Sequence, residues 1–134
     1  RSNYPVTAAA SGLVVYSRDG LVVVDLDKDG DARTGWVHLY LHVGSRERAS
    51  VGTVLKTGDR IGFPSCEGGV SSGTHLHFAR RYNGQWIPID AAHPLTLSGF
   101  EVYSTGDVYD GYLVKGDQII EAWYFQNDAN RISR

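Results

Sequence analysis

The alternation of apolar and polar residues constrains the fold of this chain more than any other feature of its sequence. Apolar residues recur at every second position, and no long stretch has the i, i+3, i+4 spacing of an amphipathic helix. Turn signals such as RDG, DKDG, YNG and KGD separate these stretches. The pattern predicts an all-β fold with strands at residues 12–17, 21–26, 36–43, 53–55, 59–63, 75–82, 85–89, 100–103, 112–114 and 119–125, of which the last alternatively forms one or two helical turns.

The length of 134 residues suits one domain with its own core. We expect residues 1–94 to form this domain and residues 95–134 to add short strands that pack on it. A net charge of -2 without a basic cluster predicts no nucleic-acid partner. No apolar run approaches the roughly 20 residues that a membrane-spanning helix needs. Because the chain starts at Arg1 and contains no methionine, we expect its natural N-terminus to have been removed.

The segment WVHLYLHV, residues 36–43, predicts the most informative strand. Its odd-numbered residues are all aliphatic and predict a side that faces the core. Its even-numbered residues are Trp36, His38, Tyr40 and His42. Polar tips of this kind destabilise a fold when they are buried without a hydrogen-bond partner. We therefore expect the even-numbered side to face a cleft.

The segment SSGTHLHF, residues 71–78, carries two histidines behind a glycine-rich approach. Residues two apart in an extended chain share a face, so we expect His75 and His77 to lie side by side. If the two predicted strands are neighbours in the sheet, His42 faces the same pocket. Imidazole is a common zinc ligand and titrates near neutral pH. The pattern therefore indicates metal binding, proton transfer or both; the alternative is that these are ordinary residues of a sheet surface.

The segment DLDKDGD presents carboxylates at alternate positions, namely Asp25, Asp27, Asp29 and Asp31. Alternating carboxylates followed by Gly30 match the first half of a calcium-binding loop, in which glycine permits the sharp turn. The second half does not match, because position twelve is Trp36 instead of a glutamate that binds through both oxygens. Two interpretations stay open: a structural calcium ion that pins a long hairpin, and an acidic turn exposed to solvent.

Three motifs together carry a resemblance to a known family. They are YLH at residues 40–42, GTVLKTGDRIG at 52–62, and SSGTHLHFARRYNGQWIPID at 71–90. In order and spacing they resemble the lysostaphin and β-lytic type of zinc metallopeptidase, which cuts peptidoglycan. The resemblance covers about residues 4–90. It implies a duplicated hybrid motif of antiparallel sheets, similar to a barrel-sandwich hybrid, with a groove at its centre. It also implies a peptide or peptidoglycan substrate that lies outside the cytoplasmic membrane.

The resemblance assigns roles to individual residues. It implies that His77 binds zinc, while His75 and His42 act on the attacking water and on the developing oxyanion. This division is chemically reasonable, because zinc makes water acidic and imidazoles can handle the proton and the charge. Tyr40 and Trp36 are expected to line the substrate groove, although Trp36 equally suits a core position.

One part of the family's pattern does not occur in this chain. The other two zinc ligands come from an H-x-x-x-D motif just before the strand that matches residues 5–15, and only residues 1–4 precede it here. We therefore expect the chain as given to hold zinc poorly and to be inactive. Either the missing pair lies upstream of Arg1, or the fold survives as a non-catalytic module that binds cell-wall peptide or a protein. A weaker alternative is a lipoyl or biotinyl carrier, suggested by Lys56 near a turn, although LKTGD lacks the carrier's tag.

Overall fold

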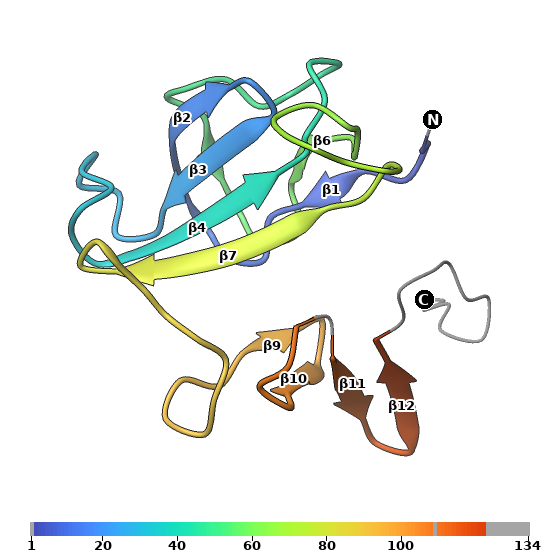
Figure 1. Ribbon diagram of the computed structural model, residues 1–134. Coiled ribbons are helices and arrows are strands. Elements are labelled where there is room, and N and C mark those ends of the chain that lie inside the picture. Colours follow the sequence, from blue (N-terminus) through green and yellow to red (C-terminus); the bar gives the residue numbers. More distant parts are fainter. Residues whose placement is uncertain (1, 109, 123–134) are drawn as a thin grey trace. The chain divides into compact units, whose positions relative to one another are not determined.

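The computed structural model of this chain describes residues 2–108 and 110–122, which form twelve β-strands joined by turns and loops (Figure 1). The strands are β1 (Val6–Thr7), β2 (Gly12–Arg18), β3 (Leu21–Asp25), β4 (Trp36–Leu41), β5 (Val54–Leu55), β6 (Arg60–Gly62), β7 (His77–Tyr82), β8 (Gln85–Trp86), β9 (Thr96–Leu97), β10 (Phe100–Ser104), β11 (Gly111–Lys115) and β12 (Gln118–Glu121). All pairings between these strands are antiparallel. The prediction of an all-β fold is therefore confirmed.

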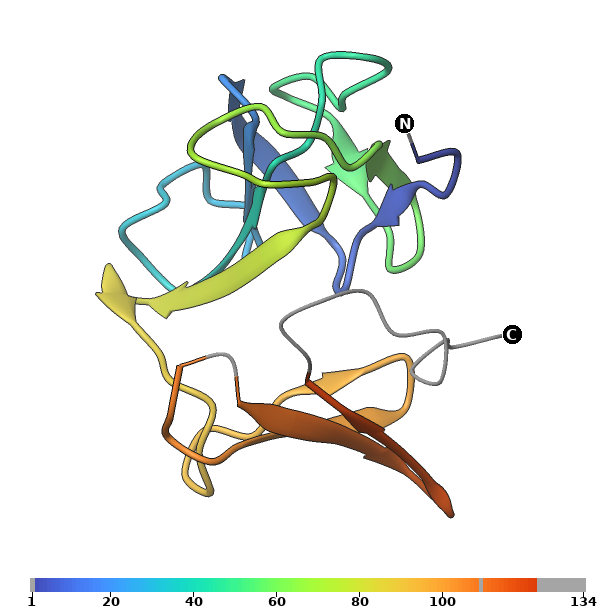
Figure 2. The same cartoon turned by 45° about the vertical axis from the view of Figure 1, so that its right-hand side comes forward.

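The chain divides into two compact units, Arg1–Ile87 and Pro88–Arg134. The first unit contains a six-stranded sheet in the order β5-β2-β3-β4-β7-β8 and a two-stranded sheet of β1 and β6. The second unit contains a four-stranded sheet in the order β12-β11-β10-β9, drawn in orange to red in Figure 2. No helix in the described part of the chain is long and apolar enough to span a membrane. The packing of residues 95–134 on the first domain stays a prediction.

Most strand positions agree with the sequence pattern, and the differences have local causes. The short strands β1 and β9, of two residues each, were not predicted. Strand β4 ends at Leu41 because the next residue has a left-handed backbone, with φ of 65°. Residues 118–121 form a strand rather than helical turns. The last part of the predicted segment 119–125 lies outside the described residues from position 123 onward.

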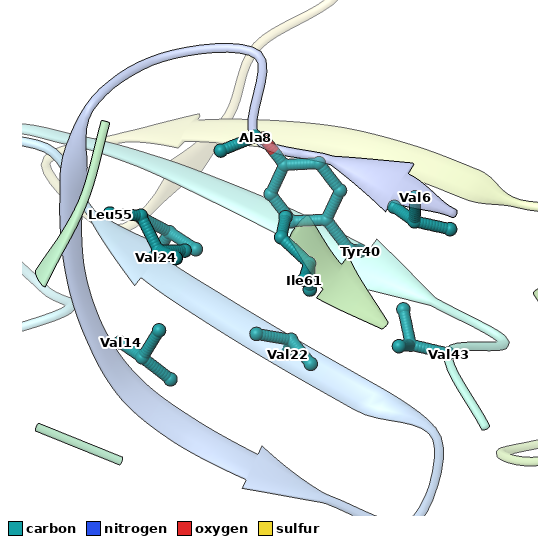
Figure 3. Packing of buried hydrophobic residues seen from close by; sticks show 9 residues of the cluster. All are labelled: Val6, Ala8, Val14, Val22, Val24, Tyr40, Val43, Leu55 and Ile61. Atoms are coloured by element: carbon teal, nitrogen blue, oxygen red, sulfur yellow. The ribbon is translucent and has the colours of Figure 1, made fainter. Parts of the chain in front are cut away.

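The core of the first unit lies on both faces of β4, which corrects the prediction that one face meets a cleft. One cluster contains Val6, Ala8, Val14, Val22, Val24, Tyr40, Val43, Leu55 and Ile61 (Figure 3). A second cluster on the odd-numbered side contains Val23, Val37 and Leu39. Tyr40 is only 1% exposed, and its hydroxyl accepts a hydrogen bond from the backbone N–H of Ala9 at 2.8 Å. Because its polar tip has this partner, burial is tolerated, and Tyr40 occupies the core instead of the predicted groove wall.

The segment GTVLKTGDRIG does not form a hairpin of two paired strands. Strand β5 pairs with β2, whereas β6 pairs with β1. The turn between them is closed by Asp59, whose side chain accepts the backbone N–H of Lys56 at 2.8 Å. Lys56 therefore lies where the chain passes from one sheet to another, rather than at the tip of a hairpin as the carrier interpretation requires.

Candidate active site

Two neighbouring strands bring His42 and His77 together at one end of the six-stranded sheet. Strands β4 and β7 are paired with Leu41 opposite His77, so these two residues lie on the same face. Strict alternation would turn His42 to the other face, but β4 ends at Leu41 and His42 has a φ of 65°. This backbone conformation is uncommon outside glycine, asparagine, aspartate and histidine. The rings of His42 and His77 have their centroids 6.5 Å apart.

His75 reaches the same place from the segment just before β7. It is outside the strand and forms an isolated antiparallel bridge with Ser65. Its ring centroid lies 4.4 Å from that of His42. His42 is only 4% exposed, whereas His75 and His77 are open to solvent. The structure therefore brings together the three histidines for which the sequence suggested roles, with one buried imidazole behind two exposed ones.

Backbone carbonyls fix the proton positions on two of these imidazoles. Nδ1 of His42 lies 2.8 Å from the carbonyl oxygen of Glu67, and Nδ1 of His75 lies 2.9 Å from that of Gly73. A carbonyl oxygen only accepts hydrogen bonds, so each Nδ1 carries the hydrogen and each neutral ring keeps its lone pair on Nε2. In the part of the chain that the structure describes, neither Nε2 has a hydrogen-bond partner. Both atoms are thus available to accept a proton or to bind a metal.

The loop of residues 64–67, here called the clamp loop, holds His42 in place. The N–H of Ser65 donates to the carbonyl of His42 at 2.7 Å, and its hydroxyl donates to the same oxygen at 3.1 Å. The hydroxyl of Ser65 also accepts the N–H of Glu67 at 3.0 Å. The loop packs closely on the turn between β2 and β3, where a Cβ on Gly20 would lie 2.5 Å from the carbonyl oxygen of Glu67. Clamp loop and turn therefore support His42 from outside its own strand.

The side chain of Glu67 is tied away from the imidazoles. Its carboxylate accepts the N–H of Ser45 at 2.8 Å and pairs with Arg48 at 3.2 Å. The hydrogen bond from Ser45, assisted by the Arg48 guanidinium, lowers the pKa of Glu67. Glu67 therefore stays ionised at neutral pH and serves the site through its backbone carbonyl rather than through its carboxylate.

A hollow of about 290 Å³ adjoins this region in the first unit. Its walls are Ser2, residues 44–46, residues 63–67 and Thr74. Arg46 lies over the ring of Phe63, with its guanidinium carbon 3.7 Å from the ring centroid. The clamp loop thus borders the hollow and also contacts His42, although none of the three histidines lines the hollow.

The three histidines supply the nitrogen donors that zinc prefers, but they do not form a complete coordination sphere among themselves. Among the described residues, the group of three acidic, histidine or cysteine side chains with ligand atoms within 4.8 Å of one another is Asp25, Asp27 and Asp29. One or two of the imidazoles therefore suit a zinc site as ligands, and the other imidazoles are left to face a substrate. His77 has no hydrogen bond in the described residues, so both of its nitrogens are available as ligands.

The other predicted site residues lie elsewhere. Trp36 begins β4, about 16 Å along the strand from Leu41 and the histidines. Its ring packs against Tyr82, with centroids 5.0 Å apart. Asp31 does not join the acidic cluster, because Arg33 binds both of its carboxylate oxygens at 2.7 and 2.8 Å. His38 is buried on the core face beside Phe78, with ring centroids 5.0 Å apart.

Sequence reasoning did not identify the groups that orient the imidazoles. They are the backbone carbonyls of Glu67 and Gly73 and the serine of the clamp loop. Main-chain acceptors leave no signal in the amino-acid sequence, since every residue has one. The only sequence feature that could have pointed to Ser65 is its position before the single cysteine in PSCEGG, and this feature is weak.

Comparison with known proteins identifies the family of this chain. The sequence profile described as Peptidase family M23 matches residues 1–89. Two curated proteins named Protease LasA, from two strains of Pseudomonas aeruginosa, are each 34% identical over 98 residues, which is 68% of this chain and 22% of theirs. The matched part thus spans about a fifth of those relatives.

The fold also resembles a solved structure described as a novel M23 metalloprotease, pseudoalterin, from deep-sea. The two share 23% sequence identity at a TM-score of 0.69, over 91% of this chain and 72% of the other. At that identity the similarity shows the fold alone. The family profile, in contrast, covers well over half of the present sequence, and this chain belongs to peptidase family M23.

Proposed function

We propose that this chain is the catalytic part of a zinc metallopeptidase that hydrolyses peptide bonds in the cross-bridges or stem peptides of peptidoglycan. The single observation that carries the proposal is the packing of His42 against His75, with ring centroids 4.4 Å apart and both Nε2 atoms left as acceptors. Two neutral imidazoles in this arrangement are equipped for proton transfer near neutral pH. Such a substrate lies outside the cytoplasmic membrane, so we also propose that the protein works there.

The two imidazoles differ in what they can do. His75 is exposed and can take the proton of an attacking water at Nε2, while its Nδ1–H stays bound to the carbonyl of Gly73. His42 is buried, and the clamp loop holds it by one hydrogen bond to its ring and two to its backbone carbonyl. A ring so fixed costs little to reorganise and can donate a hydrogen bond, once protonated, to charge that develops on the substrate carbonyl.

Members of this family are zinc metallopeptidases, and His77 is the residue that we propose as a ligand. When bound, zinc would polarise a peptide carbonyl and make a water acidic enough to attack it. A catalytic zinc normally has three protein ligands. The exposed imidazole of His77 supplies the nitrogen chemistry of one such ligand, so the described residues fit a zinc site in part. We propose that part of the peptide occupies the hollow beside the clamp loop, whose walls include Thr74, the neighbour of His75 in the chain.

The proposal is tested by replacing the three histidines one at a time in the protein as its gene encodes it, because residues 1–134 alone are expected to hold zinc poorly. Release of new amino groups from purified peptidoglycan is measured, together with zinc content by atomic absorption. His77→Ala should abolish hydrolysis and lower the zinc content. His75→Gln and His42→Gln should reduce the rate by about 10² to 10⁴ while zinc is largely retained. His93→Gln, which changes a partly exposed histidine of the second unit that pairs with Asp90, is the matched control and should leave both readouts unchanged.

Two results would contradict the proposal. One is full hydrolysis by the His77→Ala protein, which would remove that residue from the metal site. The other is tight binding of peptidoglycan by the zinc-loaded, unmodified protein without release of amino groups. That second result would favour the alternative of a non-catalytic cell-wall binding module.

A further inference from the structure

The loop that joins β3 to β4 contains a cluster of three carboxylates. Asp25 is the last residue of β3, and Asp27 and Asp29 follow at alternate positions. One carboxylate oxygen of each lies within 4.8 Å of the corresponding oxygens of the other two. In the described residues, no lysine or arginine forms a salt bridge with any of the three. No basic side chain among the described residues therefore compensates the negative charge of the cluster.

Asp25 provides a second, independent observation. Its side chain is 0% exposed, and its Oδ1 atom has no hydrogen-bond partner among the described residues. Its other oxygen, Oδ2, accepts the backbone N–H of Gly30 at 2.8 Å, so the side chain is fixed rather than free to turn outward. A buried carboxylate oxygen without a partner destabilises the fold unless a proton or a cation binds to it.

The acidic loop is also held in shape by contacts outside the carboxylate cluster. A Cβ on Gly35 would clash with the carboxylate of Asp27, and the backbone of Gly35 adopts a φ of 63°. The N–H of Gly35 donates to the side chain of Asn83 at 2.8 Å, which ties the loop to the turn after β7. Glycine at this position thus leaves Asp27 the space to face Asp25.

We propose that Asp25, Asp27 and Asp29 bind a calcium ion that stabilises the β3–β4 hairpin. Calcium takes six to eight oxygen ligands in a flexible geometry, and hard carboxylate oxygens on alternate residues before a glycine supply part of that set.

The calcium site is separate from the histidines, so its existence does not depend on the proposed peptidase activity. Asp25 pairs with Val37 near the start of β4, whereas the histidines lie at the other end, beyond Leu41. Four residues of extended strand separate Val37 from Leu41, a length of about 13 Å. Calcium has little affinity for imidazole, so added calcium reports on the acidic loop alone.

The experiment is a thermal melt of the intact protein in EDTA, in about 5 mM Ca²⁺, in Mg²⁺ at the same concentration, and in NaCl of matched ionic strength. Three carboxylates without a bidentate glutamate predict a Kd on the order of 10⁻⁴ to 10⁻³ M. Calcium should therefore raise the melting temperature by about 5 °C. Magnesium should have a smaller effect, because it requires a stricter octahedral geometry.

Asp27→Asn is the test variant, because it removes one charge from an exposed position of the cluster with little change in volume. It should lose the response to calcium and, in EDTA, should melt at or above the temperature of the unmodified protein because repulsion in the cluster is relieved. Asp31→Asn is the matched control, since its carboxylate binds Arg33 instead of the cluster. It should respond to calcium as the unmodified protein does.

Each of three results would overturn the calcium assignment. The first is a melting temperature in calcium equal to that in matched NaCl, together with an Asp25→Asn variant that is as stable as the unmodified protein, which would show that Asp25 is simply protonated. The second is a loss of the response in Asp31→Asn as complete as in Asp27→Asn. The third is an equal response to magnesium and calcium.

Discussion

The imidazole of His38 is buried on the core face of β4, where it packs beside Phe78. It is 8% exposed, and burial together with the nearby charge of Arg80 lowers its pKa from 6.5 to about 4. The folded protein thus keeps His38 neutral where the unfolded chain binds a proton. Stability should therefore fall as the pH drops from about 6.5 to about 4, by up to about 3 kcal/mol from this residue. Urea unfolding at several pH values measures the loss.

The contribution of His38 is isolated by comparing the protein with a His38→Gln variant. Glutamine does not titrate, so the difference in unfolding free energy between the two proteins should shrink or change sign between pH 6.5 and 4. Other titrating groups are common to both proteins and cancel. Parallel curves for the two proteins across this range would show that His38 titrates normally when folded.

Single residues also mark the limit of what the sequence could predict about the site. The motifs around YLH and THLH led to three histidines that the structure brings together. Alternation placed His42 on the side of Tyr40, however, and the structure turns it to the side of His77 through a left-handed backbone. Histidine adopts that conformation only occasionally, and tertiary contacts with the clamp loop stabilise it here. The sequence pattern contains no trace of such contacts.

The clamp loop is the element on which the orientation of His42 depends, and Gly20 in the β2–β3 turn tests it. Gly20→Ala places a methyl group 2.5 Å from the carbonyl of Glu67, which accepts the hydrogen bond of His42. Gly84→Ala is a matched control, because Gly84 has φ of 76° against 78° for Gly20 but its Cβ would lie 3.8 Å from the nearest atom. Both variants have the strain of alanine in a left-handed region, about 1–2 kcal/mol.

We expect Gly20→Ala to destabilise the protein by at least about 1 kcal/mol more than Gly84→Ala, since the clash adds to the strain. Urea unfolding of both variants gives the comparison. The Nδ1 proton of His42, followed by NMR, should shift or broaden only in Gly20→Ala. Equal losses of stability and an unchanged proton signal would mean that the clamp loop moves aside without cost.

The sequence predicted the positions of most strands but not all of the pairings between them. Alternation located most strands, because a buried face imposes a period of two on the residues themselves. Alternation does not indicate which partner a short strand pairs with. The pairing of β5 with β2 and of β6 with β1 was therefore not predicted. The number of buried faces was also misjudged, because the hydroxyl of Tyr40 has a backbone partner that the sequence does not reveal.

At the scale of the whole molecule, the two compact units differ in how much they bury. The first contains a cluster of nine buried side chains with a second cluster beside it. Among the described residues after Ile87, the buried hydrophobic residues are Leu95, Phe100 and Ile120. Local stability follows the number of buried apolar contacts. We therefore expect amides of β3 and β4 to exchange with solvent at least about tenfold more slowly than those of β10 and β11.

Hydrogen exchange followed by mass spectrometry tests this difference, using peptides that cover 21–41 and 100–115. Both stretches are antiparallel strands with neighbours on each side, so hydrogen bonding alone predicts similar protection. Equal exchange rates would indicate that the two units unfold as one cooperative body. Slower exchange in the first unit would place the histidines on the more stable part of the chain.

The partner of His42 is an atom that every amino acid possesses, and this has an evolutionary consequence. Any residue at position 67 would present a carbonyl oxygen to Nδ1, and the carboxylate of Glu67 acts only indirectly, by anchoring the loop to Ser45 and Arg48. A genome survey that looks for an acidic companion to a catalytic histidine would pass over this chain. The hydrogen bond between His42 and position 67 is maintained by conservation of the backbone path rather than of a particular amino acid.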